Sequence, residues 1–340
     1  MSLRHGEVLV EEAFLATIQD MGRFGHRAKG IPVSGALDRV SAAYANVLVG
    51  NPSTAPVIEA VGGRIKLRFL GGAVVSVTGG VSEVSVNGVK VPMWEPLLVE
   101  GGSTLEVRGV EKGLTVYVGV SGGFTVEPVL GSASTYVRGG FGGLGRYLRR
   151  GDALQFLRVN HVKIFRNVEG LTAPKEVVNR IAFPSSPQTI RVTKGIHSSL
   201  FCNDFDIFLN SRYVVTTRSD RMGFRLEGPR LGSASSAGKI PSIATDRGYV
   251  QVPPDGEPIV LMSDAQTTGG YAVIAHVIPP DADLLAQCPP GTEVRFTEVQ
   301  HEEAEEIVKK YLESLMNPPV DFEFPFSWGE VPPEEILRFR

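Results

Sequence analysis

Alternation of apolar and polar residues with a period of two, broken by glycine turns, is the feature that most constrains this chain. Clear runs lie at 64–69, 83–86 and 104–107. Because successive strand side chains point to opposite faces, this pattern predicts half-buried β-strands. Asn87-Gly88 stands between two such runs and predicts a type I′ hairpin. The 39 glycines and 23 prolines favour the same fold class, since both residues cost free energy inside helices.

A second series of strand patterns begins near residue 189, after a connector at 157–188 of mixed character. Two helices are predicted. One spans 38–49, with Asp38 as its N-cap and an inner stripe of small and apolar residues. The other spans 301–316 and is followed by an irregular Pro- and Phe-rich tail. The expected strands of the second series are 189–193, 213–217, 249–252, 258–262, 271–277 and 293–296.

Charge and hydropathy exclude several classes of protein. The net charge is −3, so no global basic field attracts nucleic acid or an anionic membrane. No apolar run is long enough for a membrane helix, and the first residues lack a signal-peptide pattern. Cys202 and Cys288 are the only cysteines, and a reduced pair is favoured over a disulfide. We therefore expect a cytoplasmic protein without a metal site.

The glycine-rich run 140–145 fits G-x-G-x-x-G by letter but not by context. A dinucleotide site needs a strand before and a helix after this motif, and here another strand pattern follows. No P-loop motif occurs. Two interpretations stay open: a tightly turning loop, or an anion site made by backbone N–H groups beside arginines. The anion-binding candidates are Gly142, Gly143, Gly145 and Arg146.

Three polar, glycine-flanked segments at 19–26, 218–228 and 263–271 carry the chemistry-bearing residues. Arginine presents a planar fork suited to carboxylates, and an aspartate beside it orients an amide or carboxylate ligand. Asp264 follows an apolar strand and precedes a Thr-Thr-Gly-Gly turn, a common place for a ligand-facing acid. The alternative is that Asp20–Arg23 and Asp220–Arg221 form local salt bridges within turns.

These segments, with others in the same order, resemble the allophanate hydrolase subunit 2 family, also called the carboxyltransferase C/D family. The resemblance covers roughly residues 8–305. One departure leaves the substrate open: Ser242-Ile243-Ala244 stands where relatives usually read Ser-Glu-Pro. The matching runs include Thr17-Ile18-Gln19-Asp20-Met21-Gly22-Arg23, Gly30-Ile31-Pro32-Val33-Ser34-Gly35-Ala36-Leu37-Asp38, Gly142-Gly143-Leu144-Gly145-Arg146, Ser219-Asp220-Arg221-Met222-Gly223-Phe224-Arg225 and Asp264-Ala265-Gln266-Thr267-Thr268-Gly269-Gly270-Tyr271.

The resemblance implies a mainly β protein of two β-barrel-like domains, the second cyclophilin-like, with few helices. The expected boundaries are 1–156 for the first domain, 157–188 for the connector, 189–300 for the barrel and 301–340 for the C-terminal helix and tail. It also implies the C subunit of an ATP-dependent 5-oxoprolinase, inactive alone, which works directly with a B subunit homologue and also with an A subunit homologue. The complex would consume ATP, with Mg as its counter-ion. No biotin-accepting lysine motif occurs, so no covalent cofactor is expected on this chain.

Opening a lactam requires a positive group near the developing oxyanion and an acid or base to move a proton. Two alternatives stay open: a regulatory partner that binds and antagonises a kinase inhibitor of the B subunit type, and the carboxyltransferase part of a biotin-dependent urea or amide carboxylase. The predicted catalytic residues are Asp264, Asp220 and Arg221. The predicted substrate-binding residues are Gln19, Asp20, Arg23, Arg225, Gln266, Thr267, Thr268 and Tyr271.

Overall fold

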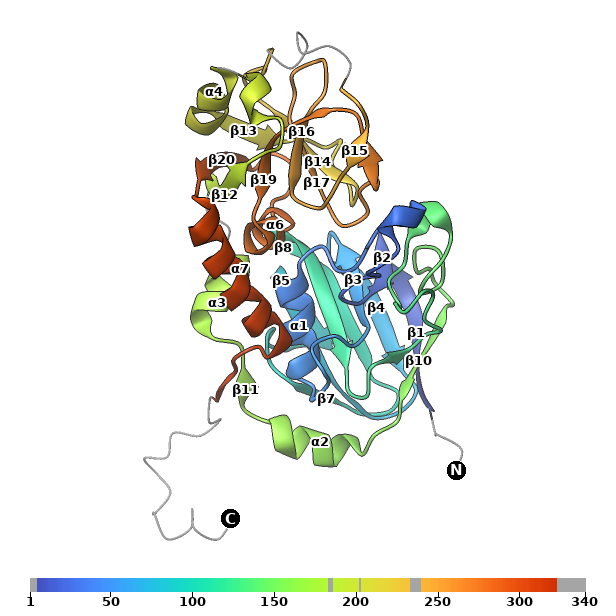
Figure 1. Cartoon of the computed structure of the whole chain (residues 1–340). Coiled ribbons are helices and arrows are strands. Elements are labelled where there is room, and N and C mark those ends of the chain that lie inside the picture. Colours follow the sequence, from blue (N-terminus) through green and yellow to red (C-terminus); the bar gives the residue numbers. More distant parts are fainter. Residues whose placement is uncertain (1–4, 183–185, 202, 233–239, 323–340) are drawn as a thin grey trace, which may run out of the picture.

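The computed structural model describes residues 5–182, 186–201, 203–232 and 240–322. The fold combines two β bodies that lie one above the other in Figure 1. We call them the N-terminal sheet, formed by β1 to β10 with helix α1, and the C-terminal barrel, formed by the closed ring of seven strands between β12 and β20. Both are mainly β, as the period-two patterns predict.

The N-terminal sheet is a half-barrel, a curved sheet of ten strands that does not close on itself. The strands are β1 (His5–Ala13), β2 (Ala16–Gln19), β3 (Val57–Val61), β4 (Arg64–Phe69), β5 (Ala73–Val86), β6 (Val89–Lys90), β7 (Leu97–Val99), β8 (Thr104–Val120), β9 (Phe124–Thr125) and β10 (Ala153–Leu157), with short 3₁₀ turns η1 (Arg27–Lys29) and η2 (Val137–Gly139). The longest strand, β8, pairs with β3, β4 and β5. In the core of the sheet, the rings of Phe69 and Phe156 pack edge to face with their centroids 6.4 Å apart.

Two local sequence patterns correctly predicted elements of the N-terminal sheet: the Asn87-Gly88 hairpin and the Asp38 helix cap. Asn87 and Gly88 both have positive φ, 52° and 80°, and join β5 to β6 as the hairpin signal predicts. Helix α1 (Arg39–Val47) begins after Asp38, whose side chain accepts a hydrogen bond from the Ser41 backbone N–H at 3.0 Å.

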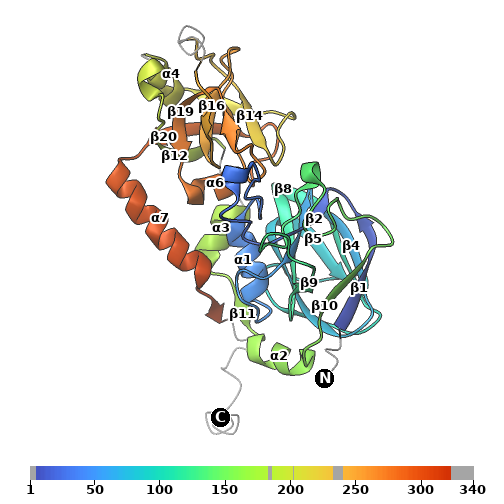
Figure 2. The same cartoon turned by 45° about the vertical axis from the view of Figure 1, so that its right-hand side comes forward.

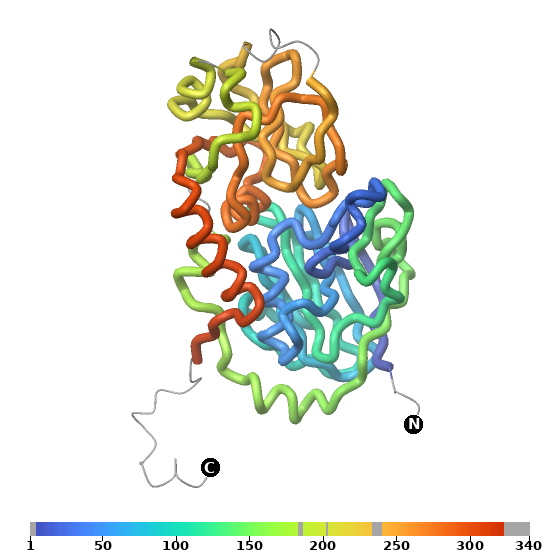
Figure 3. The backbone as a smooth tube through the Cα atoms, in the orientation of Figure 1, coloured from blue at the N-terminus to red at the C-terminus, as the bar shows by residue number. Residues whose placement is uncertain are grey.

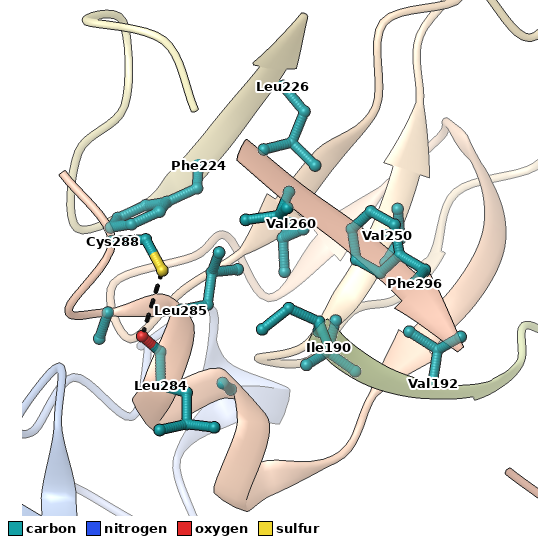
Figure 4. Close-up of a cluster of buried hydrophobic side chains, with 14 of the residues drawn as sticks. Ile190, Val192, Phe224, Leu226, Val250, Val260, Leu284, Leu285, Cys288 and Phe296 are labelled. Carbon is teal, nitrogen blue, oxygen red and sulfur yellow. Dashed lines mark hydrogen bonds between the residues drawn. The ribbon is translucent and has the colours of Figure 1, made fainter. Parts of the chain in front are cut away.

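The C-terminal barrel closes because β12 pairs in parallel with β20 and antiparallel with β19. Its interior is filled by apolar side chains, which Figure 4 shows converging from facing strands. Phe208 and Phe296 stack with ring centroids 4.3 Å apart. The strands are β12 (Gln188–Lys194), β13 (Arg212–Val215), β14 (Gly223–Glu227), β16 (Tyr249–Val252), β17 (Ile259–Leu261), β19 (Ala272–Val277) and β20 (Glu293–Glu298), with the small pair β15 (Ile243–Ala244) and β18 (Thr268–Gly269) beside them.

Several short helices were not predicted. The connector holds α2 (His161–Val168), β11 (Leu171–Thr172) and α3 (Lys175–Ala182), and the barrel region holds η3 (Ser198–Phe201), α4 (Asp204–Asn210) and α6 (Pro279–Leu285). Helix α6 starts with Pro279-Pro280, which suits the first turn of a helix because the missing N–H groups would be unpaired there. These helices are about two turns long or shorter, too short for a strong periodic signal.

Helix α7 (His301–Met316) is the predicted C-terminal helix and links the two bodies (Figure 2). Ala304 packs under the barrel with Ile278 and Val299, while Tyr311 and Leu315 pack on Ala43 of α1.

After α7 the chain forms β21 (Asp321–Phe322), which pairs with β11, so the part of the tail that is described is ordered by a strand pair. Figure 3 shows the helix running beside both bodies. The rest of the predicted tail, 323–340, lies outside the described residues.

Candidate functional site

Arg221 is the centre of a buried charged cluster between the two bodies. It lies in the turn between β13 and β14, and its side chain is 9% exposed. Its Nε donates to Asp264 Oδ2 at 2.8 Å and its Nη2 donates to Asp264 Oδ1 at 3.1 Å, a bidentate pair. Its Nη1 donates to Glu59 of β3. Arg221 therefore joins a barrel carboxylate to a carboxylate of the N-terminal sheet.

Glu59 and Tyr117 complete the cluster, which we call the Arg221 cluster (Arg221, Asp264, Glu59 and Tyr117). Glu59 Oε2 accepts from the Leu37 backbone N–H at 2.7 Å and from the Tyr117 hydroxyl at 2.8 Å. Burial, and then the Glu59 charge, raise the pKa of Tyr117 well above its ordinary value, so the phenol stays protonated and donates. Burial would lower the pKa of Arg221, but Asp264 and Glu59 outweigh it and raise that pKa. The cluster is thus internally paired.

The segment 35–37 is clamped by the barrel. Gly35 has φ 85°, and a Cβ there would stand 3.0 Å from the Gly22 backbone, so glycine is what lets this segment pass close to residue 22. Three successive carbonyls accept hydrogen bonds from barrel side chains: Gly35 from Arg221 Nη2 at 2.7 Å, Ala36 from Ser263 Oγ at 3.1 Å, and Leu37 from Arg247 Nη2 at 2.5 Å.

Of the three predicted catalytic side chains, the structure brings together Arg221 and Asp264 and sets Asp220 apart. The Asp220 carboxylate is 53% exposed, accepts from the Met222 backbone N–H at 2.8 Å and pairs with Arg138 at 3.2 Å. Asp220 and Arg221 do not form the local turn salt bridge that the alternative interpretation expected. Asp220 is the one of the three that reaches solvent, because Asp264 and Arg221 are buried against each other.

Gln19, Asp20 and Arg23 hold the loop 129–135 in place. The Asp20 carboxylate accepts from the Gly22 and Ala133 backbone N–H groups and from the hydroxyls of Ser132 and Ser134. Arg23 is fully buried, donates to backbone carbonyls of the same loop and lies 4.9 Å above the Phe141 ring. Gln19 donates to the Thr135 carbonyl at 3.1 Å. All three side chains face protein groups in this structure.

Three glycines of the run 140–145 are required by close packing against neighbouring backbone and side-chain atoms. A Cβ on Gly142 would lie 1.9 Å from the Ser134 carbonyl oxygen, and one on Gly143 would lie 2.2 Å from Thr135 Oγ1. A Cβ on Gly145 would lie 2.5 Å from a backbone carbonyl oxygen. Both terminal nitrogens of Arg146 are bonded to the Asp152 carboxylate, at 2.8 and 2.7 Å. The Arg146 guanidinium, which the anion hypothesis needs as a free group, is therefore already paired with the Asp152 carboxylate.

Arg225, Thr268 and Tyr271 are exposed, and Thr267 is half-buried. Thr268 lies on β18, and the carbonyl of Thr267 just before it accepts from the Thr245 backbone N–H at 3.0 Å. Arg225 lies on the outer face of β14. In the described parts of the chain, no hydrogen bond or ion pair joins these side chains to the Arg221 cluster.

A cavity of about 260 Å³ lies beside the Arg221 cluster, between the loop that precedes α1 and the barrel. We call it the interbody cavity. Gln266 is the one predicted site residue on its wall, and its Nε2 donates to Gln251 at 3.1 Å. Asp20, Arg221 and Asp264, one from each of the three predicted polar segments, do not line this cavity. Its walls are formed by Phe24, Gly25, Arg27, Pro32, Val33, Arg39, Asp246, Arg247, Met262, Ser263, Ala265, Gln266, His276, Pro279 and Ala282.

Sequence reasoning missed Glu59 as a charge partner and missed Arg39 and Arg247 on the cavity wall. Asp246-Arg247-Gly248 is a charged, glycine-ended turn before β16, the same kind of signal that singled out the other segments. Arg39 directly follows the helix cap Asp38 and carries no signal that separates it from a solvated helix arginine. Among the described residues, no three His, Cys, Asp or Glu side chains gather as metal ligands.

The fold is shared with known proteins. The family "carboxyltransferase domain, subdomain A and B" matches residues 29–298, so the chain belongs to that family. The carboxyltransferase kinship is confirmed, with subdomains A and B in place of the C and D of the expectation. No helix within the described residues has the length and apolar character needed to cross a bilayer.

Individual relatives place the chain among two groups. It is 36% identical over 305 residues to the C subunit of 5-oxoprolinase from Haemophilus influenzae, covering 88% of this chain and 94% of that protein. It is 35% identical over 304 residues to the C subunit of 5-oxoprolinase from Escherichia coli, covering 87% and 92%. The crystal structure of the K. lactis urea amidolyase superposes with a TM-score of 0.82 at 26% identity, over 96% of this chain and 21% of that one.

Proposed function

We propose that this chain is the C subunit of an ATP-dependent 5-oxoprolinase, which opens 5-oxo-L-proline to L-glutamate together with the A and B subunits. The observation that carries the proposal is the match at 36% and 35% identity along 94% and 92% of two 5-oxoprolinase C subunits. At that identity and coverage, we expect the family scaffold and its cavity to be shared along nearly the whole relative.

The chemistry of the cavity suits a small amide. Its walls combine apolar groups with the Gln266 amide and guanidinium groups, and pockets of this composition fix the orientation of a small ligand by a few polar contacts. Lactam opening develops negative charge on the carbonyl oxygen, which nearby cations stabilise. We assign the Arg221 cluster a positioning role, since its charges already bind one another, and place the substrate on the cavity side of Gln266.

The experiment is reconstitution from purified chains. This chain, homologues of the A and B subunits, ATP, Mg²⁺ and 5-oxo-L-proline are mixed, and glutamate and ADP are measured. Glutamate formation that needs all three proteins and ATP supports the proposal. Tight binding to the B subunit without glutamate formation supports the regulatory alternative and contradicts the proposal. Omission of each protein in turn is the control.

A second candidate is the carboxyltransferase part of a urea or amide carboxylase. It is favoured by the superposition on urea amidolyase, at a TM-score of 0.82 over 96% of this chain. Its test replaces 5-oxoproline with urea and adds bicarbonate and a biotin-bearing partner. Urea consumption that depends on biotin, with no glutamate from 5-oxoproline, would select this candidate.

A further inference from the structure

Two arginines of the interbody cavity carry buried donors that no protein group satisfies. Arg247 has a side chain only 10% exposed, yet its Nε and Nη1 are buried without a hydrogen-bond partner. Arg39 likewise has a buried Nε without a partner, and none of its nitrogens forms an ion pair within the described residues. Buried guanidinium donors are normally paired, because an unpaired buried donor loses its hydrogen bonds to water and gains none in return.

Two of the three arginines on the cavity wall are already paired with carboxylates. The carboxylates already have partners: Arg27 pairs with Asp246 at 2.5 Å, and Arg247 Nη2 pairs with Asp283 at 2.8 Å. The second Asp283 oxygen accepts from the Tyr311 hydroxyl at 2.6 Å. Within the described part of the chain, Arg39 is left as a cation without a carboxylate in contact.

The pKa shifts of Arg39 and His276 agree with an arginine that has no charged partner in contact within the described residues. Burial, and then the like charge of Arg247, lower the pKa of Arg39. Burial also lowers the pKa of His276, whose ring shares a hydrogen bond with the Arg247 carbonyl, so His276 is neutral and adds no charge at pH 7. Arg39 is therefore the arginine of the cavity wall that is left to pair with an anionic ligand.

The geometry points to a binding site for a small carboxylate that also carries an amide, with the carboxylate held between Arg39 and Arg247 and the amide beside Gln266. A cavity of about 260 Å³ is just below the roughly 300–1,000 Å³ of typical ligand sites, which suits a ligand of only a few atoms. Apolar walls from Val33, Met262 and Pro279 suit the carbon skeleton of an organic acid better than a bare inorganic ion.

This inference rests on the proposed function for one point, the identity of the ligand as 5-oxoproline. Its carboxylate would occupy the guanidinium pair and its lactam would face Gln266. The site itself rests on the unpaired donors and on the cavity that they adjoin. The existence of the site and the identity of its ligand can therefore be tested separately.

The test is calorimetric titration of the full chain with four probes. These are 5-oxo-L-proline, pyrrolidin-2-one (the same lactam without the carboxylate), malonamate (an open-chain amide with a carboxylate) and inorganic phosphate. We expect saturable binding of 5-oxo-L-proline and of malonamate and none of pyrrolidin-2-one. Arg39→Met should weaken binding about tenfold or more, since it removes a charged hydrogen bond.

Two further variants control the test. Arg247→Met should weaken binding as much as Arg39→Met, with thermal unfolding confirming that each variant is folded. Arg39→Met keeps the test decisive if Arg247→Met fails to fold, because the Arg39 Nε has no protein partner to lose. Arg108→Met is the matched control on an exposed arginine of the N-terminal sheet and should leave affinity unchanged.

Each outcome decides between the claims. Malonamate binding that depends on Arg39, without binding of 5-oxo-L-proline, supports the site and contradicts the assignment of 5-oxo-L-proline as its ligand. Binding of phosphate alone, binding of no probe, or binding that Arg39→Met does not change overturns the site. A reconstituted complex that makes glutamate while neither 5-oxo-L-proline nor malonamate binds this chain overturns the site and keeps the proposed function.

Discussion

Two groups of buried arginines lie side by side between the bodies, and they differ in one respect. Arg221 is bonded to Asp264, Glu59 and a backbone carbonyl. Arg39 and Arg247, on the interbody cavity, keep buried nitrogens without partners. A buried cation whose donors are all paired holds parts of the protein together, whereas one with free donors beside a cavity is available to a ligand.

The difference separates the arginine that the sequence motifs single out from those that line the cavity. Arg221 lies in the most specific motif of the chain and was predicted to be catalytic, but its contacts are those of a residue that joins the two bodies. Arg39 and Arg247 lie in no motif that was singled out, yet they line the cavity. Substitutions that remove one charge at a time can separate the two roles.

The largest effect is expected from Arg221→Met. Removing the guanidinium leaves Glu59 and Asp264 buried without their cation, which typically costs about 3–5 kcal/mol of unfolding free energy. Chemical denaturation of the purified chain measures this. Arg225→Met, an exposed arginine on β14, is the control and should stay within about 0.5 kcal/mol of the parent. A stable Arg221→Met chain whose reconstituted complex lacks turnover would contradict the joining role.

A pH-dependent effect of intermediate size is expected from Asp38, which lies behind both groups. Burial, and then the Asp283 charge, raise its pKa from 3.8 to about 6. The folded state therefore holds this proton more tightly than the unfolded chain. Its contribution to the unfolding free energy is greatest below pH 3.8 and is lost as the pH rises through 6; a shift of this size corresponds to about 3 kcal/mol.

The measurement is denaturation of parent and Asp38→Asn between pH 4.5 and 8. The asparagine variant should lack this part of the pH dependence, although it also perturbs the Gln287 contact at 2.9 Å at every pH. Parallel pH profiles for the two chains would show that Asp38 has an ordinary pKa and that the region is better solvated than its burial indicates.

The smallest effect on stability is expected from Arg39→Met. Because the buried Nε of this guanidinium has no protein partner, its removal should leave the unfolding free energy within about 1 kcal/mol of the parent or raise it slightly. The contrast with Arg221→Met in the same denaturation series sharpens the comparison. A loss of several kcal/mol would mean that Arg39 stabilises the fold, and the free-donor interpretation would then be wrong.

Local patterns predicted individual elements well. The α7 boundaries, the Asp38 cap and the Asn87-Gly88 hairpin all depend on residues within a few positions of one another. Short helices such as α6 escaped because two turns give too few periodic positions. The Arg221–Glu59 ion pair was not predicted for another reason. The two residues are 162 positions apart in the sequence, and no short-range spacing predicts such a contact.

What the sequence determined by itself is the mainly β character, the two strand series, the carboxyltransferase kinship and the polar corners at 19–26, 218–228 and 263–271. What only the tertiary structure decided is which charges are paired. A side chain's partners depend on distances of a few ångströms between segments far apart in the chain, and the cost of burying a charge depends on those partners. Arg221 and Arg39 are the same residue type in the sequence, but in the folded protein Arg221 has carboxylate partners and Arg39 has none in contact among the described residues.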